Sequence, residues 1–235
     1  LNPWFDRDLS IAGRVVCQSS EGKLSSHLID LKRPVAFIPS LAIHLDKEAN
    51  KNRSINPQTD LSPIVLQLNT NQDLREVLQK ECLNAELMII DYELYLYDSM
   101  GAMELGLQNE FFSSGRLDNL LSCFLGVEAL TQADSKHFCA LVCNDHEEVG
   151  SISANAAGGT FLESVFERIF VNRPLSSVLT SSMFVSCDNA HAVHPNYKRQ
   201  HDMWHQPVLN RGPVIKVNAK QRYATTSLTS SIFKK

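Results

Sequence analysis

The chain has 235 residues, of which 43% are hydrophobic and 20% are charged. This length can bury one large core or two modest ones, which excludes a mini-protein that needs disulfides or metals in order to fold. Lys and Arg total 22 against 26 Asp and Glu, giving a net charge of −4, and this excludes the strongly basic surface that binds nucleic acid or anionic membranes. No apolar stretch is long enough to cross a membrane, so we expect neither nucleic acid nor a membrane as a partner.

The cysteines and the start of the chain indicate the cellular compartment of the protein. No Cys-x-x-Cys pair is present, and no positively charged leader opens the sequence. We therefore expect a cytoplasmic protein whose reduced thiols lie in the core. The first residue is Leu1 rather than Met, so we expect the chain to be a piece of a longer protein.

The first half of the chain is predicted to be mainly β. Residues 11–17 and 24–31 flank a Ser-Ser-Glu-Gly turn and predict a hairpin. Asp73 is a candidate N-cap for a short helix over residues 73–82, which carries apolar residues on one side. Residues 87–97, rich in Ile, Leu and Tyr, predict a further strand.

The second half is predicted to alternate helices and strands. Apolar residues at helical spacing predict a helix over residues 114–131, and Thr160 with Glu163 forms a capping-box pattern at the start of a second helix. Short apolar runs predict buried strands at 138–143, 183–187 and 214–217. The fold class is therefore α/β, with a largely parallel central sheet flanked by helices that follows a mainly β module. We place the domain boundary near residue 108, giving a module at 1–108 and a second domain at 109–235.

Acidic residues follow two of these predicted strands. Residues 144–151 follow one strand and include Glu147 and Glu148, while Asp188 follows another and precedes two histidines. Ligands bind at the carboxyl ends of strands in open α/β sheets, and Asp118 lies near the start of a helix, where a carboxylate is favoured. Four acids together repel one another unless a cation is present, and these ligand types suit zinc or manganese.

The adjacent Glu147 and Glu148 cannot approach one metal from the same direction. One carboxylate is therefore expected to coordinate, while the other takes a proton from metal-bound water. A solvated acidic turn would explain this cluster taken alone. The second acidic strand end, at Asp188, favours a metal site. His146 is expected to orient the turn, and His194 either to hold its own loop or to support a metal ligand.

Six segments of the sequence, taken in order, resemble the M18 metalloaminopeptidases, and most closely the bacterial aspartyl aminopeptidase type. They span nearly the whole chain, at residues 4–9, 41–45, 115–120 (Gly-Arg-Leu-Asp-Asn-Leu), 145–151 (Asp-His-Glu-Glu-Val-Gly-Ser), 188–197 (Asp-Asn-Ala-His-Ala-Val-His-Pro-Asn-Tyr) and 212–225. The resemblance implies a dinuclear zinc hydrolase that removes N-terminal residues, preferably Asp or Glu, from peptides. Mn²⁺ or Co²⁺ would also suit such ligands.

Site residues follow from the same resemblance. By position, Asp118 is similar to the carboxylate that bridges the two zinc ions, Glu148 to a ligand of one ion and Asp188 to a ligand of the other. Glu147 is similar to the general base that activates the bridging water. These roles imply a metal-activated water as the nucleophile.

Four further residues fall on substrate-contacting positions of the family, namely His44, His191, Lys216 and Tyr223. Lys216 would either anchor a carboxylate of the substrate or stabilise the developing oxyanion, and the sequence does not choose between them. His44, in the β module, is similar to a histidine that reaches a neighbouring subunit's active site; a zinc-ligand role is the weaker alternative.

The resemblance also implies a homo-oligomer, in which dimers assemble into dodecamers and residues 1–108 form the dimerisation insert. The family places one zinc-binding histidine before residues 4–9 and another after Tyr223, and the chain has neither. We therefore expect an incomplete metal site and an inactive fragment. A non-catalytic assembly or regulatory module with a relic site is the alternative, although the intact Glu147–Glu148 pair favours the enzyme.

Overall fold

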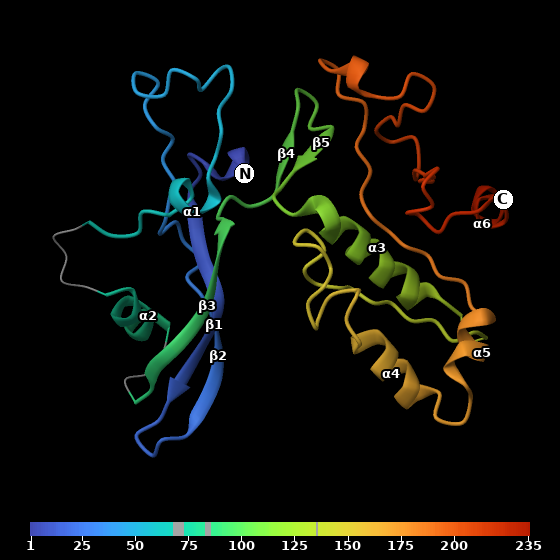
Figure 1. The fold of residues 1–235 in the computed structure, drawn as a ribbon, viewed down its shortest axis with the longest axis horizontal. Helices are drawn as coiled ribbons and strands as arrows, with labels where there is room; N and C mark the ends of the chain where they lie inside the picture. The colour runs from blue at the N-terminus through green and yellow to red at the C-terminus, as the bar shows by residue number, and fades with distance from the viewer. Residues whose placement is uncertain (68–72, 83–85, 135) are drawn as a thin grey trace. The chain divides into compact units, whose positions relative to one another are not determined.

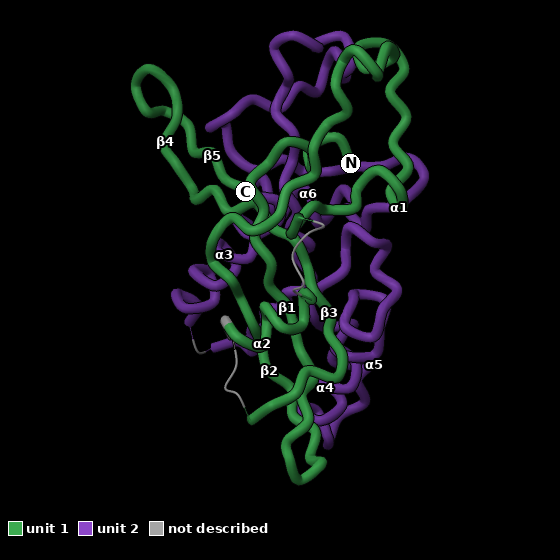
Figure 2. The backbone as a smooth tube through the Cα atoms, turned by 90° about the vertical axis from the view of Figure 1, so that its left-hand side faces the viewer, with its two compact units in different colours: residues 1–115 green, residues 116–235 purple. Residues whose placement is uncertain are grey.

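The computed structural model describes residues 1–67, 73–82, 86–134 and 136–235. The chain divides into two compact units, Leu1–Gly115 and Arg116–Lys235, which Figure 2 shows in different colours. None of the helices within these described ranges is long and apolar enough to span a membrane.

A three-stranded antiparallel sheet forms the centre of unit 1 (Figure 1). Strand β1 (Leu9–Gln18) lies between β2 (Leu24–Asp30) and β3 (Met88–Asp98), which confirms the predicted hairpin and the predicted third strand. The predicted turn closes the hairpin through a hydrogen bond of 2.9 Å from the Gly22 N–H to the Ser19 carbonyl. Gly22 has φ +79°, a conformation that favours glycine and so fixes the turn at this position.

The main core of unit 1 lies between this sheet and helix α2 (Leu74–Cys82). Asp73 caps the helix as predicted, because its carboxylate accepts a hydrogen bond of 3.3 Å from the Arg75 N–H. Leu78 is fully buried, and it belongs to one cluster with buried side chains of all three strands, namely Val15, Cys17, Ile29 and Ile89. The side chain of Cys82, predicted on the same apolar stripe, lies outside the described part of the structure.

Unit 1 also holds elements that the sequence did not predict. These are a 3₁₀ helix η1 (Asn2–Trp4), a one-turn helix α1 (Pro57–Asp60) and a hairpin of β4 (Met103–Leu105) with β5 (Phe111–Ser113). Each has only three or four residues, too few to show a periodic pattern.

Unit 2 contains the two predicted helices, α3 (Leu117–Gln132) and α4 (Phe161–Ile169). It also has the shorter helices α5 (Leu175–Thr180) and α6 (Ser227–Lys234) and a 3₁₀ helix η2 (Lys198–Gln200). Phe138 packs edge-on against Phe166 of α4 and Phe170, with ring centroids 6.5 and 5.2 Å away. Residue 138 is thus held by an aromatic cluster at the end of α4.

The three strands predicted in unit 2 are absent from its described residues. Segments 138–143, 183–187 and 214–217 have no assigned secondary structure. A strand exists only through hydrogen bonds to a neighbouring strand, and none of these segments makes such bonds in the described part of the chain. For the same reason Cys139, Cys143 and Cys187, expected in the core, are exposed, whereas Cys17 is buried.

The predicted capping box at α4 is also wrong. Thr160 occupies the N-cap position, but its side chain makes no capping hydrogen bond. Its backbone, at φ −88° and ψ 3°, lacks the extended conformation that directs an N-cap hydroxyl at the first turn. A capping box forms instead at α6, where Thr226 and Thr229 bond reciprocally.

Candidate active site

The start of α3 places Asp118 at one side of the candidate site. Arg116, just before the helix, has a left-handed backbone with φ +63°, and Asp118 and Asn119 have non-helical dihedral angles. The regular helix therefore begins after Asn119. Asp118 is exposed just before the regular helix, at the end where the helix dipole favours a negative charge.

Asp188 and Lys216 form an ion pair with an Nζ to Oδ2 distance of 2.5 Å. The hydrogen bond from Lys216 holds the pKa of Asp188 below its usual range, although partial burial opposes this, and Asp118 contributes in the same direction as Lys216. The Asp188 carboxylate in turn raises the pKa of Lys216, and Asp118 contributes to this rise. The two carboxylates and the ammonium group therefore belong to one electrostatic cluster.

Tyr223 completes this cluster. The Lys216 Nζ lies 6.0 Å from the centroid of the Tyr223 ring, at the outer limit of a cation–π contact. Four of the eight predicted site residues, Asp118, Asp188, Lys216 and Tyr223, are thus brought together within unit 2.

The turn that carries Glu147 and Glu148 is held by local hydrogen bonds. The His146 N–H donates to the Asp145 carboxylate at 2.8 Å, and the His146 Nδ1 lies 2.6 Å from the Ser153 hydroxyl. These bonds agree with the predicted role of His146 in orienting the turn. Both glutamate side chains are exposed.

The predicted ligand set matches zinc in chemical type but is not assembled. Carboxylate oxygens are suitable zinc ligands, and Asp118 and Asp188 interact. Within the described residues, however, no three His, Cys, Asp or Glu side chains lie close enough together to hold a metal ion. Because segments 138–143 and 183–187 do not pair, no sheet edge brings Glu148 beside Asp188. Lys216 supplies the positive charge that balances the aspartates instead.

The predicted histidines differ in their surroundings. His44 lies in an exposed turn of unit 1, and His191 is exposed in unit 2. His194 holds its own loop. Its ring Nδ1 accepts a hydrogen bond of 3.2 Å from the backbone N–H of Asn196, and its own backbone N–H donates to the ring Nε2 of His201 at 3.1 Å. This contact supports the loop-holding alternative for His194.

The sequence reasoning missed Asn189 and Ser122. The Ser122 hydroxyl donates to the Asn189 side-chain oxygen at 2.9 Å, and the Asn189 amide donates to the Leu117 carbonyl at 2.7 Å. An amide directly after a candidate ligand is a signal that could have been followed, since it both donates and accepts.

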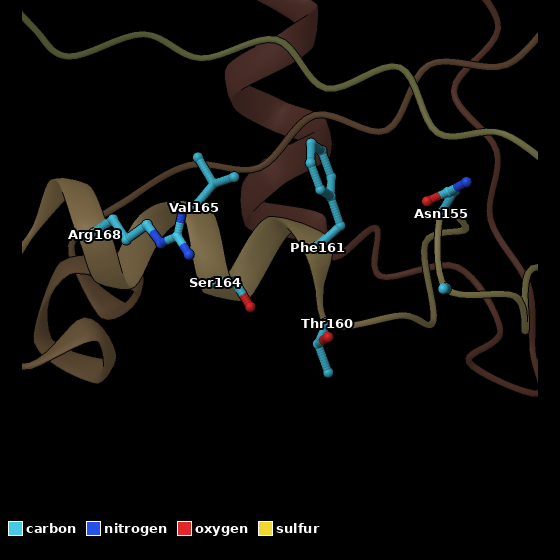
Figure 3. A pocket seen from close by; sticks show the side chains of 7 residues that line it. Asn155, Thr160, Phe161, Ser164, Val165 and Arg168 are labelled. Carbon is cyan, nitrogen blue, oxygen red and sulfur yellow. The ribbon is translucent and has the colours of Figure 1, made fainter. Parts of the chain in front are cut away.

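A pocket of about 300 Å³ lies along α4, and Figure 3 shows its lining side chains, six of them labelled. Thr160, Phe161, Ser164, Val165 and Arg168 come from the helix and its N-cap, and Asn155 comes from the preceding loop. No predicted site residue lines this pocket, so the chemistry is not assigned to it.

Comparison with known proteins identifies the family. The model of the Aminopeptidase I zinc metalloprotease (M18) family matches residues 1–235, and the chain therefore belongs to that family. It is 50% identical over 242 residues to the probable M18 family aminopeptidase 2 of Pseudomonas fluorescens (strain Pf0-1), a match that covers 100% of this chain and 56% of the relative. The corresponding protein of Pseudomonas entomophila (strain L48) gives the same identity and coverage. The chain thus spans about half the length of the curated relatives it matches.

Solved structures agree on the fold. A cryo-EM structure of the Ape4 and Nbr1 complex matches with a TM-score of 0.84 and 38% identity, covering 99% of this chain and 50% of that one. The S. cerevisiae mApe1 dodecamer matches with a TM-score of 0.68 and 27% identity, covering 89% and 50%. These similarities confirm the predicted fold class, a partial α/β zinc-peptidase domain that follows a β-rich module.

Proposed function

We propose that the complete protein is a zinc aminopeptidase that hydrolyses N-terminal residues, preferably Asp or Glu, from peptides. The observation that carries the proposal is the family match over all 235 residues. The meeting of Asp118, Asp188 and Lys216 in one cluster supports it. Because the described residues gather only two of the predicted ligands, we expect the activity in the complete protein rather than in this chain alone.

In this proposal Asp118, Glu148 and Asp188 would hold the zinc ions, with Asp118 as the ligand shared by both. Manganese or cobalt could replace zinc, since the ligand oxygens suit all three. A bound zinc would polarise the scissile carbonyl and lower the pKa of coordinated water towards about 7.

Glu147 acts as the general base. Its exposed carboxylate accepts a proton from the attacking water and then returns that proton to the leaving amine. The hydrogen bonds of His146 hold the turn that presents this side chain. Glu148, the adjacent residue, takes the ligand role.

Lys216 provides the preference for acidic residues. It is a cation that already binds a carboxylate, that of Asp188, and a substrate carboxylate has the same chemistry. His191 and Tyr223 contact the substrate beside it. His44 contacts the substrate bound by a neighbouring subunit.

Self-association through unit 1 belongs to the same proposal. Strands β2 and β3 are the edges of the sheet, and Leu28 of β2 is 82% exposed. Such edges and apolar side chains favour pairing with another chain. The solved mApe1 dodecamer supports a homo-oligomer, either a dimer or a dodecamer built from dimers. Light scattering on the complete protein tests this, and a single-chain mass at micromolar concentration would contradict it.

The proposed activity is tested by release of N-terminal Asp from a short peptide. The complete protein is expected to release Asp, to lose this activity in a chelator and to recover it when zinc or manganese is added. A matched peptide that begins with Leu should be cleaved more slowly. If a folded, zinc-loaded preparation releases neither residue, the non-catalytic assembly module becomes the better reading.

Replacing Lys216 by Met separates its two possible roles. If Lys216 anchors the substrate carboxylate, Lys216→Met should raise KM for the Asp peptide about tenfold or more, since charged hydrogen bonds contribute about 1.5–3 kcal/mol. KM for the Leu peptide should not change. A fall of kcat on both peptides would instead mean that Lys216 stabilises the developing oxyanion. Lys220→Met, on an exposed lysine of the same segment, is the matched control.

A further inference from the structure

We propose that Asn189 is a positioning residue that fixes the spacing between Asp188 and Asp118. The inference deepens the proposed function and rests on it, because its consequence is measured on the metal site. Asn189 directly follows Asp188, and its side chain reaches the first turns of α3, where Asp118 lies. One side chain therefore joins the two segments that carry the candidate ligands.

Both ends of the Asn189 amide are used. Its oxygen accepts from the Ser122 hydroxyl at 2.9 Å, and its nitrogen donates to the Leu117 carbonyl at 2.7 Å. Leu117 immediately precedes Asp118, and Ser122 lies one helical turn after it. The two contacts therefore bracket Asp118.

Such a link is needed because the two aspartates repel each other. Carboxylates that share a site separate unless a cation or a fixed geometry holds them together. The ion pair with Lys216 compensates their charge but leaves their spacing free, since the lysine side chain is long and flexible. The two hydrogen bonds of Asn189 supply the spacing.

The chemistry of the link favours Asn over its close analogues. Asp at this position could accept from Ser122, but it could not donate to the Leu117 carbonyl, and it would add a third negative charge beside Asp118 and Asp188. Ala would remove both bonds. Residues that orient metal ligands typically change metal affinity by 10–100-fold when they are replaced.

The test measures zinc affinity of the complete protein by competition with a coloured chelator, together with kcat and the thermal midpoint of the metal-free protein. Asn189→Ala is expected to weaken zinc binding by about 10–100-fold and to lower kcat, with the midpoint close to that of the wild type. Ser122→Ala removes one of the two bonds and should give a smaller effect in the same direction. Asn172→Ala, in an exposed turn of the same unit, should change neither quantity.

Three outcomes are distinguishable. If the wild type binds zinc and releases Asp while Asn189→Ala behaves identically, the positioning role is overturned and the proposed function stands. If the wild type neither binds zinc nor releases Asp, the proposed function fails. In that case, hydrogen exchange of the backbone amides of residues 117–122 tests the positioning role of Asn189 independently of zinc. Faster exchange in Asn189→Ala supports that role, and unchanged exchange overturns it. If Asn189→Ala does not fold, Ser122→Ala carries the same comparison.

Discussion

Replacing Glu147 by Gln is expected to lower kcat for release of N-terminal Asp by about 10²–10⁴-fold, the usual contribution of a general base. Glutamine keeps the size and the hydrogen-bonding capacity of the side chain but cannot accept the proton of the attacking water. Because Glu147 is assigned no ligand role, the zinc content and KM of the complete protein should stay unchanged. Steady-state kinetics and metal analysis on one preparation provide the measurement.

The neighbouring residue supplies the decisive contrast. Glu148→Gln is expected to reduce bound zinc, because an amide oxygen is a poorer ligand than a carboxylate, and activity should return in part at high zinc concentration. Glu167→Gln, on the exposed side of α4, is the control for removing a carboxylate. If Glu147→Gln loses zinc while Glu148→Gln keeps it, the two roles are exchanged. If both variants retain full activity, the pair has no catalytic role.

Unit 1 was largely predictable because its structure depends on neighbouring parts of the sequence. The turn at Gly22, the N-cap at Asp73 and the alternation along β1 each signal an element within a few residues. An antiparallel hairpin also carries its own pairing partner. The strand at 87–97 was predicted from its own residue pattern, but its pairing with β1, about 80 residues away, was not, because no local signal specifies it.

Unit 2 was predictable in its helices but not in its strands. A helix satisfies its own backbone hydrogen bonds, so the pattern over 114–131 was enough to locate α3. The apolar runs at 138–143 and 183–187 can become strands only beside partners, and the described residues provide none. The acidic segments that follow them are therefore not aligned along a common edge.

The candidate site likewise has residues that the sequence could predict and residues that depend on contacts between distant parts of the chain. The sequence placed Asp118 and Asp188 in one site, and the structure brings them together with Lys216 and Tyr223. Asn189 escaped prediction because its importance lies in contacts with Leu117 and Ser122, some 70 residues away in the chain. Glu147 and Glu148 depend on a sheet edge that the described structure lacks, so their roles stay predictions.

Leu78→Ala is expected to destabilise unit 1 by about 2–5 kcal/mol, the range for removing a buried leucine side chain from a packed core. Leu78 is fully buried between α2 and the sheet. Helix α2 has only nine residues, and a helix of that length is marginal in water without tertiary packing. The loss of Leu78 should therefore release α2 as well as leave a cavity against Val15 and Ile89.

Native-state hydrogen exchange measures this effect within unit 1, because the protection of the β1 amides reports the opening of its own sheet. Protection of the Val15 and Cys17 amides should fall by about 30-fold or more in Leu78→Ala. Leu28→Ala is the matched control, since Leu28 belongs to the same sheet but is 82% exposed, and its effect should stay within about 0.5 kcal/mol. If both effects are small, α2 does not hold the sheet; if both are large, the face bearing Leu28 is packed as tightly as the core. A large effect of Leu28→Ala would also mean that the surface proposed for self-association contributes to the stability of unit 1.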